Sequence, residues 1–239
     1  MEMLTIKNVL DKERIPYSDM NLGWSDASLS SYKEILYGLP MSTHIYGVEL
    51  YEDIVPPENY HRIDHHNDKT MCKSSLEQVM ELLGISMDRH QTLVALNDRG
   101  YIPAMKHFGA TDHEVAYIRL LDRKVQGVTA IDEQLAEKSI NENMEIIGSV
   151  IKLRAYSPKF SPICDRLYPY QTLLIYTDSE WMLYGRGADE VRLMFEQEYG
   201  KGKLFCGGGS CGYIGAKQSV YTADAIKNMV DKIIERIAR

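Results

Sequence analysis

Residues 60–84, YHRIDHHNDKTMCKSSLEQVMELLG, constrain the fold most, because they predict a strand, a polar turn and a helix in direct succession. A short strand is expected around 61–63, directly before the polar turn. Ser74 and Glu77 have the spacing of a capping box, and Gly84 is a typical helix stop. This succession is typical of an α/β layer.

Asp64, His65 and His66 follow the predicted strand directly. Neighbouring residues of a strand point to opposite faces, but their side chains can converge where the chain bends at the strand's end. A carboxylate beside two imidazoles is then a candidate metal site. A hydrogen-bonded Asp–His pair is the alternative, and for an isolated triplet it is the more frequent one.

The rest of the N-terminal half predicts one more strand and then mainly helices. The strand is THIYGVEL, and the predicted helices cover 26–37, 88–96, 114–127 and 129–140. We therefore expect an α/β fold whose N-terminal domain, 1–145, has a largely parallel sheet and a helical annex.

The C-terminal part starts a new pattern after a proline-containing segment. Pro158, Pro162 and Pro169 lie close together, and we interpret 146–170 as a linker. A smaller α/β domain over 171–239 is expected to follow. Its predicted elements are a hairpin turning at Asp178-Ser179, a helix over 188–200, a Gly-rich strand and loop over 203–217, and a helix capped by Thr222.

Two separated motifs give the chain a family resemblance. RIDHHN followed by SSLEQVMELLG, and later CGGGSCGYIGA, resemble the two signature regions of the DHH phosphoesterase family in order and approximate spacing. The resemblance extends from about Asp19 to the C-terminus. It implies a DHH domain, a DHH-associated C-terminal domain that holds the substrate, and a two-metal centre.

The resemblance also implies a set of metal ligands. They are Asp19, Glu49, Asp64, His65 and Asp98, taken in the order of the family's motifs. Asn21 stands where a second carboxylate is expected, and the stretch between the first two motifs is short. The implied ions are manganese or, as an alternative, magnesium, which activate water and neutralise charge on a phosphoryl group.

Catalytic and substrate-binding roles follow from the same resemblance. Catalytic roles are implied for Asp64, His65 and His66, the last of which would orient the site or stabilise the leaving oxygen. A guanidinium fork matches phosphate oxygens, and glycines let backbone amides approach an anion. The resemblance implies substrate binding by the loop Gly207, Gly208, Gly209 and Ser210, in which Ser210 replaces the family's histidine. Arg99 and Arg123 are substrate-binding candidates on the chemistry of their side chains.

Each of these residues has a structural alternative. Asp19 and Asn21 are also typical turn formers. A glutamate at a strand end, such as Glu49, is more often a solvated carboxylate than a metal ligand. Asp98 can belong to a helix-ending turn. Arg99 and Arg123 each follow an aspartate directly, so a structural ion pair is at least as well supported for them as contact with a phosphate. Three glycines after a strand are typical of a tight turn.

The charge balance narrows the expected partners. Lys and Arg number 27 against 34 Asp and Glu, a net charge of −7, which disfavours binding to long duplex nucleic acid. We expect a small nucleotide or short oligonucleotide instead, and the resemblance adds a homodimer. The N-terminal residues do not resemble a signal peptide and no run reaches the ~20 apolar residues of a membrane span, which predicts a cytoplasmic protein without a membrane partner.

These observations lead to one functional hypothesis and one rival. The hypothesis is a metal-dependent phosphoesterase that hydrolyses a small phosphodiester or phosphate ester with activated water. The rival is a catalytically impaired relative that acts as a nucleotide-binding or interaction module, because Asn21, Glu49 and Ser210 depart from the family's pattern.

Overall fold

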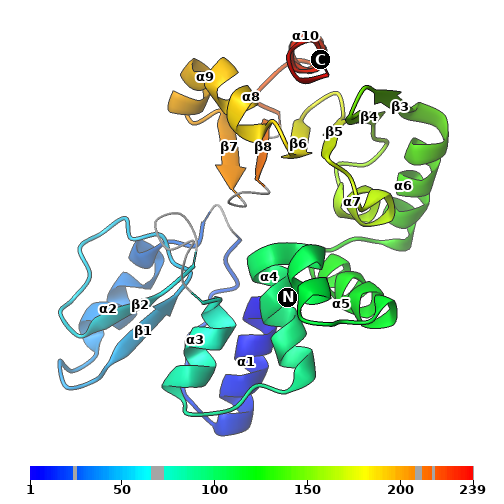
Figure 1. The fold of residues 1–239 in the computed structure, drawn as a ribbon. Helices are drawn as coiled ribbons and strands as arrows, with labels where there is room; N and C mark the ends of the chain where they lie inside the picture. The colour runs from blue at the N-terminus through cyan, green and yellow to red at the C-terminus, as the bar shows by residue number, and fades with distance from the viewer. Residues whose placement is uncertain (24–25, 66–72, 208–211, 217–218, 239) are drawn as a thin grey trace. The chain divides into compact units, whose positions relative to one another are not determined.

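The computed structural model describes residues 1–23, 26–65, 73–207, 212–216 and 219–238. The chain divides into two compact units, Met1–Leu121 and Asp122–Arg239 (Figure 1).

The first unit combines a pair of strands with several helices. Its strands are β1 (Ile45–Val48) and β2 (Tyr60–Ile63). Its helices are α1 (Glu2–Glu13), the 3₁₀ turn η1 (Leu29–Tyr32), α2 (Lys33–Gly38), α3 (Ser75–Leu82), α4 (Arg89–His107) and α5 (Asp112–Val125), which continues past the boundary.

Strands β1 and β2 are parallel and in register, with Ile45 opposite Tyr60 and Val48 opposite Ile63. The carboxyl ends of both strands therefore meet at one edge. The pairing requires a glycine in β1, because a Cβ on Gly47 would lie 2.3 Å from the Tyr60 hydroxyl. Both strands confirm the sequence prediction, and their shared edge is where the candidate residues leave the sheet.

Helix α3 forms as its sequence predicts. The Ser74 hydroxyl accepts a hydrogen bond from the Glu77 N–H, the Glu77 carboxylate accepts one from the Ser74 N–H, and Gly84 follows with φ of 67°. Helix α4 extends well beyond the predicted 88–96, with a break at Gly100 and Tyr101.

Helix α1, which the sequence analysis did not predict, completes the core of the first unit. Its buried Ile6 and Val9 face the cluster of helices α3 and α4, whose buried residues include Leu76 and Leu93. Charged residues occur every few positions along α1, which hides its apolar stripe. The packing of α1 brings the N-terminal residues next to the start of α3.

The second unit has a six-stranded sheet in the order β3-β4-β5-β6-β8-β7. The strands are β3 (Met144–Ile147), β4 (Val150–Arg154), β5 (Thr172–Tyr176), β6 (Trp181–Gly185), β7 (Leu204–Gly207) and β8 (Tyr213–Ala216). The helices are α6 (Ala130–Asn143), α7 (Ser161–Leu167), α8 (Ala188–Met194), α9 (Glu196–Gly200) and α10 (Ala223–Ile237).

Alternating residues of the central strands fill a core on each face of this sheet. Leu173 and Ile175 of β5 pack with residues of α6 and α7, while Leu174 packs with α8 and α10. The β5–β6 hairpin and the Thr222 cap of α10 confirm the sequence prediction. The single helix predicted over 188–200 is wrong, because α8 ends at Met194 and α9 starts at Glu196.

The α/β class is confirmed, and the finer arrangement differs from the expectation. The larger sheet lies in the second unit and is mixed, since only β4 and β5 in it are parallel. The units divide between 121 and 122, not at 146–170, and that predicted linker contains β4 and α7. Its prolines fit a helix start and turns, which the composition could not distinguish from a linker.

None of the helices in the described part of the chain is long and apolar enough to cross a membrane.

We expect Gly47→Ala to lower the free energy of unfolding by about 1–3 kcal/mol, because the added methyl overlaps the Tyr60 ring. Urea unfolding followed by circular dichroism measures this change. Gly38→Ala is the control, since a Cβ there meets nothing within 4 Å and alanine favours the helix. Equal stability of the two variants would contradict the packing described for β1 and β2.

Candidate metal centre

The carboxyl ends of β1 and β2 deliver the first two residues of the site. Glu49 follows β1 directly with φ of 54°, and its N–H donates to the Ile63 carbonyl at 2.9 Å. His65 follows β2 by two residues and is buried. Side chains at the carboxyl ends of neighbouring parallel strands commonly form ligand sites.

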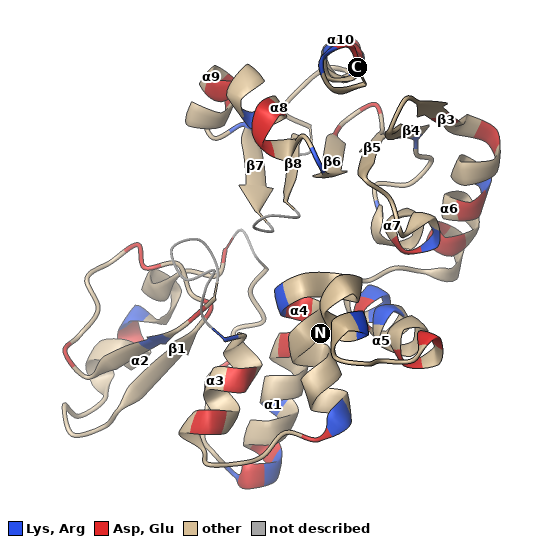
Figure 2. Ribbon diagram, in the orientation of Figure 1, with Lys and Arg blue, Asp and Glu red and all other residues tan. Residues whose placement is uncertain are grey.

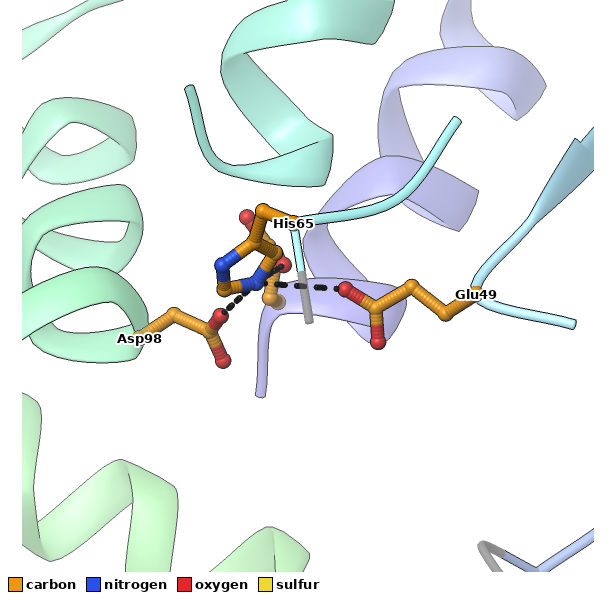
Figure 3. Close-up of side chains that lie close together, drawn as sticks. Glu49, His65 and Asp98 are labelled. Carbon is orange, nitrogen blue, oxygen red and sulfur yellow. Dashed lines mark ion pairs between the residues drawn. The ribbon is translucent and has the colours of Figure 1, made fainter. Parts of the chain in front are cut away.

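Two helices contribute the remaining residues, Glu2 at the start of α1 and Asp98 within α4. Together with Glu49 and His65 they form the His65 cluster, whose ligand atoms all lie within 4.8 Å of one another. His65 Nε2 is 2.6 Å from Asp98 Oδ2 and 3.3 Å from Glu49 Oε1 (Figure 3). The same nitrogen is 3.7 Å from Glu2 Oε2. Four segments distant in the sequence thus meet at one point.

A single N–H group does not account for this convergence. His65 Nε2 carries at most one hydrogen, and one carboxylate is enough to accept it. Glu2 Oε2 is buried and accepts no hydrogen bond from the described residues. Carboxylates held this close repel one another unless a cation compensates them, so the arrangement suits a metal ion better than a proton.

The carboxylates strongly perturb the protonation of the cluster. Burial disfavours the imidazolium of His65, but the nearby carboxylates of Asp98, Glu2 and Glu49 outweigh it and raise the pKa of His65 to about 12. Burial also raises the pKa of Glu2 above its ordinary value, and the charges of Asp98 and Glu49 add to this effect. The protonated His65 therefore supplies a positive charge among the carboxylates.

The first turn of α3 holds two of the carboxylates in place. The Ser75 hydroxyl donates to Glu49 Oε1 at 2.8 Å, and the Leu76 N–H donates to Glu2 Oε1 at 2.9 Å. Ser75 is fully buried, so these bonds are shielded from water. The positive end of the helix dipole favours carboxylates at this position, and such outer contacts orient metal ligands.

The break in α4, at Gly100 and Tyr101, begins two residues after Asp98. Tyr101 has φ of 56° and ψ of −149°, outside the helical range. The buried Arg119 of α5 donates to Asn97 Oδ1 at 3.0 Å, and its guanidinium lies 4.5 Å from the centre of the Tyr101 ring. Arg119 thereby braces the helix on both sides of the break and fixes the segment that carries Asp98.

The cluster contains three of the five ligands implied by the family resemblance: Glu49, His65 and Asp98. Asp64 lies outside the group and accepts hydrogen bonds from Arg62. Asp19 is exposed, where it accepts the Asn21 N–H at 2.7 Å and lies 3.4 Å from Lys7 Nζ. These contacts of Asp19 and Asn21 are those of a turn, the alternative to a role in metal binding.

The two arginines implied for substrate binding both take part in ion pairs. Arg99 lies 3.4 Å from the Glu77 carboxylate and remains 40% exposed. Arg123 contacts Glu133 at 2.7 Å and also pairs with Asp165, and it is only 13% exposed. The contacts of Arg123 are therefore those of a structural ion pair.

The predicted glycine loop is described only at its first residue. Gly207 ends β7, and a Cβ there would lie 2.7 Å from the Tyr213 hydroxyl, which is a packing reason for glycine. Gly208, Gly209, Ser210 and the catalytic candidate His66 lie outside the described residues.

Glu2 is the member of the cluster that sequence reasoning missed. Its position at the start of a helix is ordinary for an acidic residue, so no local pattern marks it as a ligand. Only the packing of α1 against α3 and α4 brings it to His65.

No family model matches the sequence, and no curated protein matches it.

Metal binding is expected to release one proton, because His65 is protonated below pH 12 and must be neutral to bind a metal. The apparent affinity for Mn²⁺ should therefore rise about tenfold per pH unit between about pH 6 and 9. Calorimetric titrations in buffers of different ionisation enthalpy measure the released proton. A pH-independent affinity would contradict the protonation described for His65.

Glu2 and Asp19 give opposite expectations for the same change. Glu2→Gln should weaken Mn²⁺ binding by more than about 100-fold, since loss of an outer contact alone costs about 10–100-fold. Asp19→Asn should leave the affinity unchanged, because Asp19 lies outside the cluster. Calorimetry on both variants decides between the two ligand assignments. The family resemblance names Asp19 and not Glu2 as a ligand, so it predicts weaker Mn²⁺ binding in Asp19→Asn and unchanged binding in Glu2→Gln.

Proposed function

We propose that this protein is a metal-dependent phosphoesterase of the DHH type, which hydrolyses a small phosphodiester or phosphate ester. The observation that carries the proposal is the convergence of three carboxylates and one imidazole at the carboxyl ends of β1 and β2. The order of the motifs along the sequence supports the phosphoesterase assignment over other uses of a metal.

The donor set favours manganese as the ion, with magnesium as the alternative. Carboxylate oxygens suit Mg²⁺ and Mn²⁺, while an imidazole also suits the transition metals. The orphaned oxygen of Glu2 and the charge of three carboxylates fit a divalent cation. Glu2, Glu49, His65 and Asp98 would hold the ion.

A bound ion would supply a water of lowered pKa and positive charge for the phosphoryl group. His65 presents Nε2 as a ligand once its proton has left. Ser75 and Leu76 keep the carboxylates of Glu49 and Glu2 oriented through their hydrogen bonds. Asp98 is 31% exposed, so the substrate reaches the cluster from its side.

Arg99 is the cation that we assign to the substrate phosphate. It directly follows Asp98 in α4 and is 40% exposed, so its guanidinium can exchange the Glu77 carboxylate for a phosphate. Figure 2 shows acidic and basic residues interspersed along the helices of both units. This distribution favours a small nucleotide or short oligonucleotide over a long duplex.

The contacts of Asp19 and Asp64 favour a second candidate function. Both lie outside the cluster, so among the described residues the site has fewer donors than the family resemblance implies. A relative with impaired catalysis would keep metal and nucleotide binding without turnover.

Hydrolysis of bis-p-nitrophenyl phosphate with Mn²⁺ tests the proposal. We expect kcat/KM to fall by more than about 100-fold in Glu49→Gln and in His65→Asn, because each variant loses a ligand of the ion. Glu81→Gln and His107→Asn are matched controls, since both residues are exposed and outside the cluster, and they should retain the wild-type rate.

Metal binding without turnover on the phosphodiester, on nucleotides or on short oligonucleotides would favour the binding module instead. Turnover that persists in His65→Asn would contradict the proposed centre.

A further inference from the structure

A second group of side chains that can bind metal lies on the β1–β2 pair, toward the amino ends of the strands. His44 directly precedes β1, and His61 is the second residue of β2. Tyr46 is directly opposite His61 in the register, and residues two apart on a strand share a face. The rings of His44, Tyr46 and His61 therefore gather on one face, and all three side chains are exposed.

Two imidazole nitrogens face each other within this group. His44 Nδ1 and His61 Nε2 are 3.0 Å apart, whereas the ring centres are 5.3 Å apart, so the nitrogens lie on the facing edges of the rings. A hydrogen bond between them requires a proton on one nitrogen and a lone pair on the other. A metal ion bound by both requires two lone pairs, which neutral histidines supply after a change of tautomer.

The surroundings of the pair restrict its movement. The side-chain amide of the buried Asn59 donates to the Thr43 carbonyl at 2.6 Å, directly before His44. The Tyr46 ring is stacked on that of His61, with the ring centres 5.0 Å apart and the planes at 26°. Ligand atoms that are held in place before binding lose less freedom when they bind, which favours affinity.

The separation of the two nitrogens suits a transition metal ion. Zinc–nitrogen bonds of about 2.0–2.1 Å at a tetrahedral angle place two nitrogens about 3.3–3.4 Å apart, close to the observed 3.0 Å. A small tilt of the two exposed rings supplies the difference. Imidazole nitrogen suits zinc, copper and nickel, whereas magnesium and manganese prefer oxygen ligands. The pair therefore selects a different class of ion from the carboxylate-rich His65 cluster.

We propose that His44 and His61 form a surface site for a divalent ion of the zinc, copper and nickel group. Each residue supplies one nitrogen to the ion. The bound ion links the segment before β1 to β2, so it stabilises the folded strand pair. The proposal goes beyond phosphoesterase activity and does not depend on it, because it concerns other residues and another class of ion.

Copper is the probe for the pair, because electron paramagnetic resonance of Cu²⁺ counts the imidazole nitrogens bound to the ion. One equivalent of Cu²⁺ is added to the intact chain with excess Mg²⁺, which competes for the carboxylates of the His65 cluster. We expect two bound nitrogens in the wild type. His44→Gln and His61→Gln should each lose this signal and bind Cu²⁺ about tenfold more weakly or worse, because the chelate is broken.

Two further variants make the assignment specific. His107→Gln is the matched control, since this exposed histidine lies in α4, and it should keep the two-nitrogen signal. His65→Asn should also keep it, which separates this site from the proposed metal centre. A single bound nitrogen in the wild type, or two that persist in His44→Gln, would overturn the proposal.

Protection by Zn²⁺ gives a second measurement that needs no variant. Diethyl pyrocarbonate acylates unprotonated imidazole nitrogens, and tandem mass spectrometry measures the modification at each histidine. Zn²⁺ should slow the modification of His44 and His61 in the wild type and leave that of His107 unchanged. Equal rates at His44 and His61 with and without Zn²⁺ would overturn the proposal. Failure of Mn²⁺ to bind would overturn the proposed function instead and leave this site standing.

Discussion

Three carboxylates converge on the Nε2 atom of one buried imidazole. Like charges this close repel one another, so the elements around the cluster must hold and compensate them. The start of α3 donates hydrogen bonds to Glu49 and Glu2. The brace from Arg119 holds the segment of α4 that carries Asp98. The parallel pairing of β1 and β2 places Glu49 and His65 at one edge. Much of the first unit's polar structure thus serves this cluster.

The same electrostatics connect the fold to the proposed chemistry. A proton on His65 balances part of the charge, and a bound ion would take over this role. The carboxylates that raise the pKa of His65 are therefore the groups that make the site attractive to a divalent cation. Arg62 compensates the charge of the Asp64 carboxylate in the same way. Its guanidinium stays charged near neutral pH, so this compensation does not depend on a titrating proton.

The second unit follows different constraints, since its central strands alternate between two apolar cores. Its hairpin and its capped terminal helix were predictable because local turn and capping patterns determine them. The segment 146–170 was not, because prolines that begin a helix or occupy turns have the same composition as a linker. Arg123 illustrates a related limit. Its partners Glu133 and Asp165 come from other helices, so the sequence alone could not show whether Arg123 binds a phosphate or forms a structural ion pair.

The sequence by itself determined the local elements at the site: the strand ending at Ile63, the capped helix after Ser74, and the candidacy of Glu49, His65 and Asp98. The elements depend on periodicity and capping, which act over a few residues, while the candidacy of Glu49 and Asp98 was implied by the family resemblance. The tertiary structure decided which side chains meet. The packing of α1 places Glu2 in the cluster. Asp19 lies in an exposed turn, and Asp64 forms an ion pair with Arg62. Convergence of charges from distant segments depends on packing and burial, which no local pattern encodes.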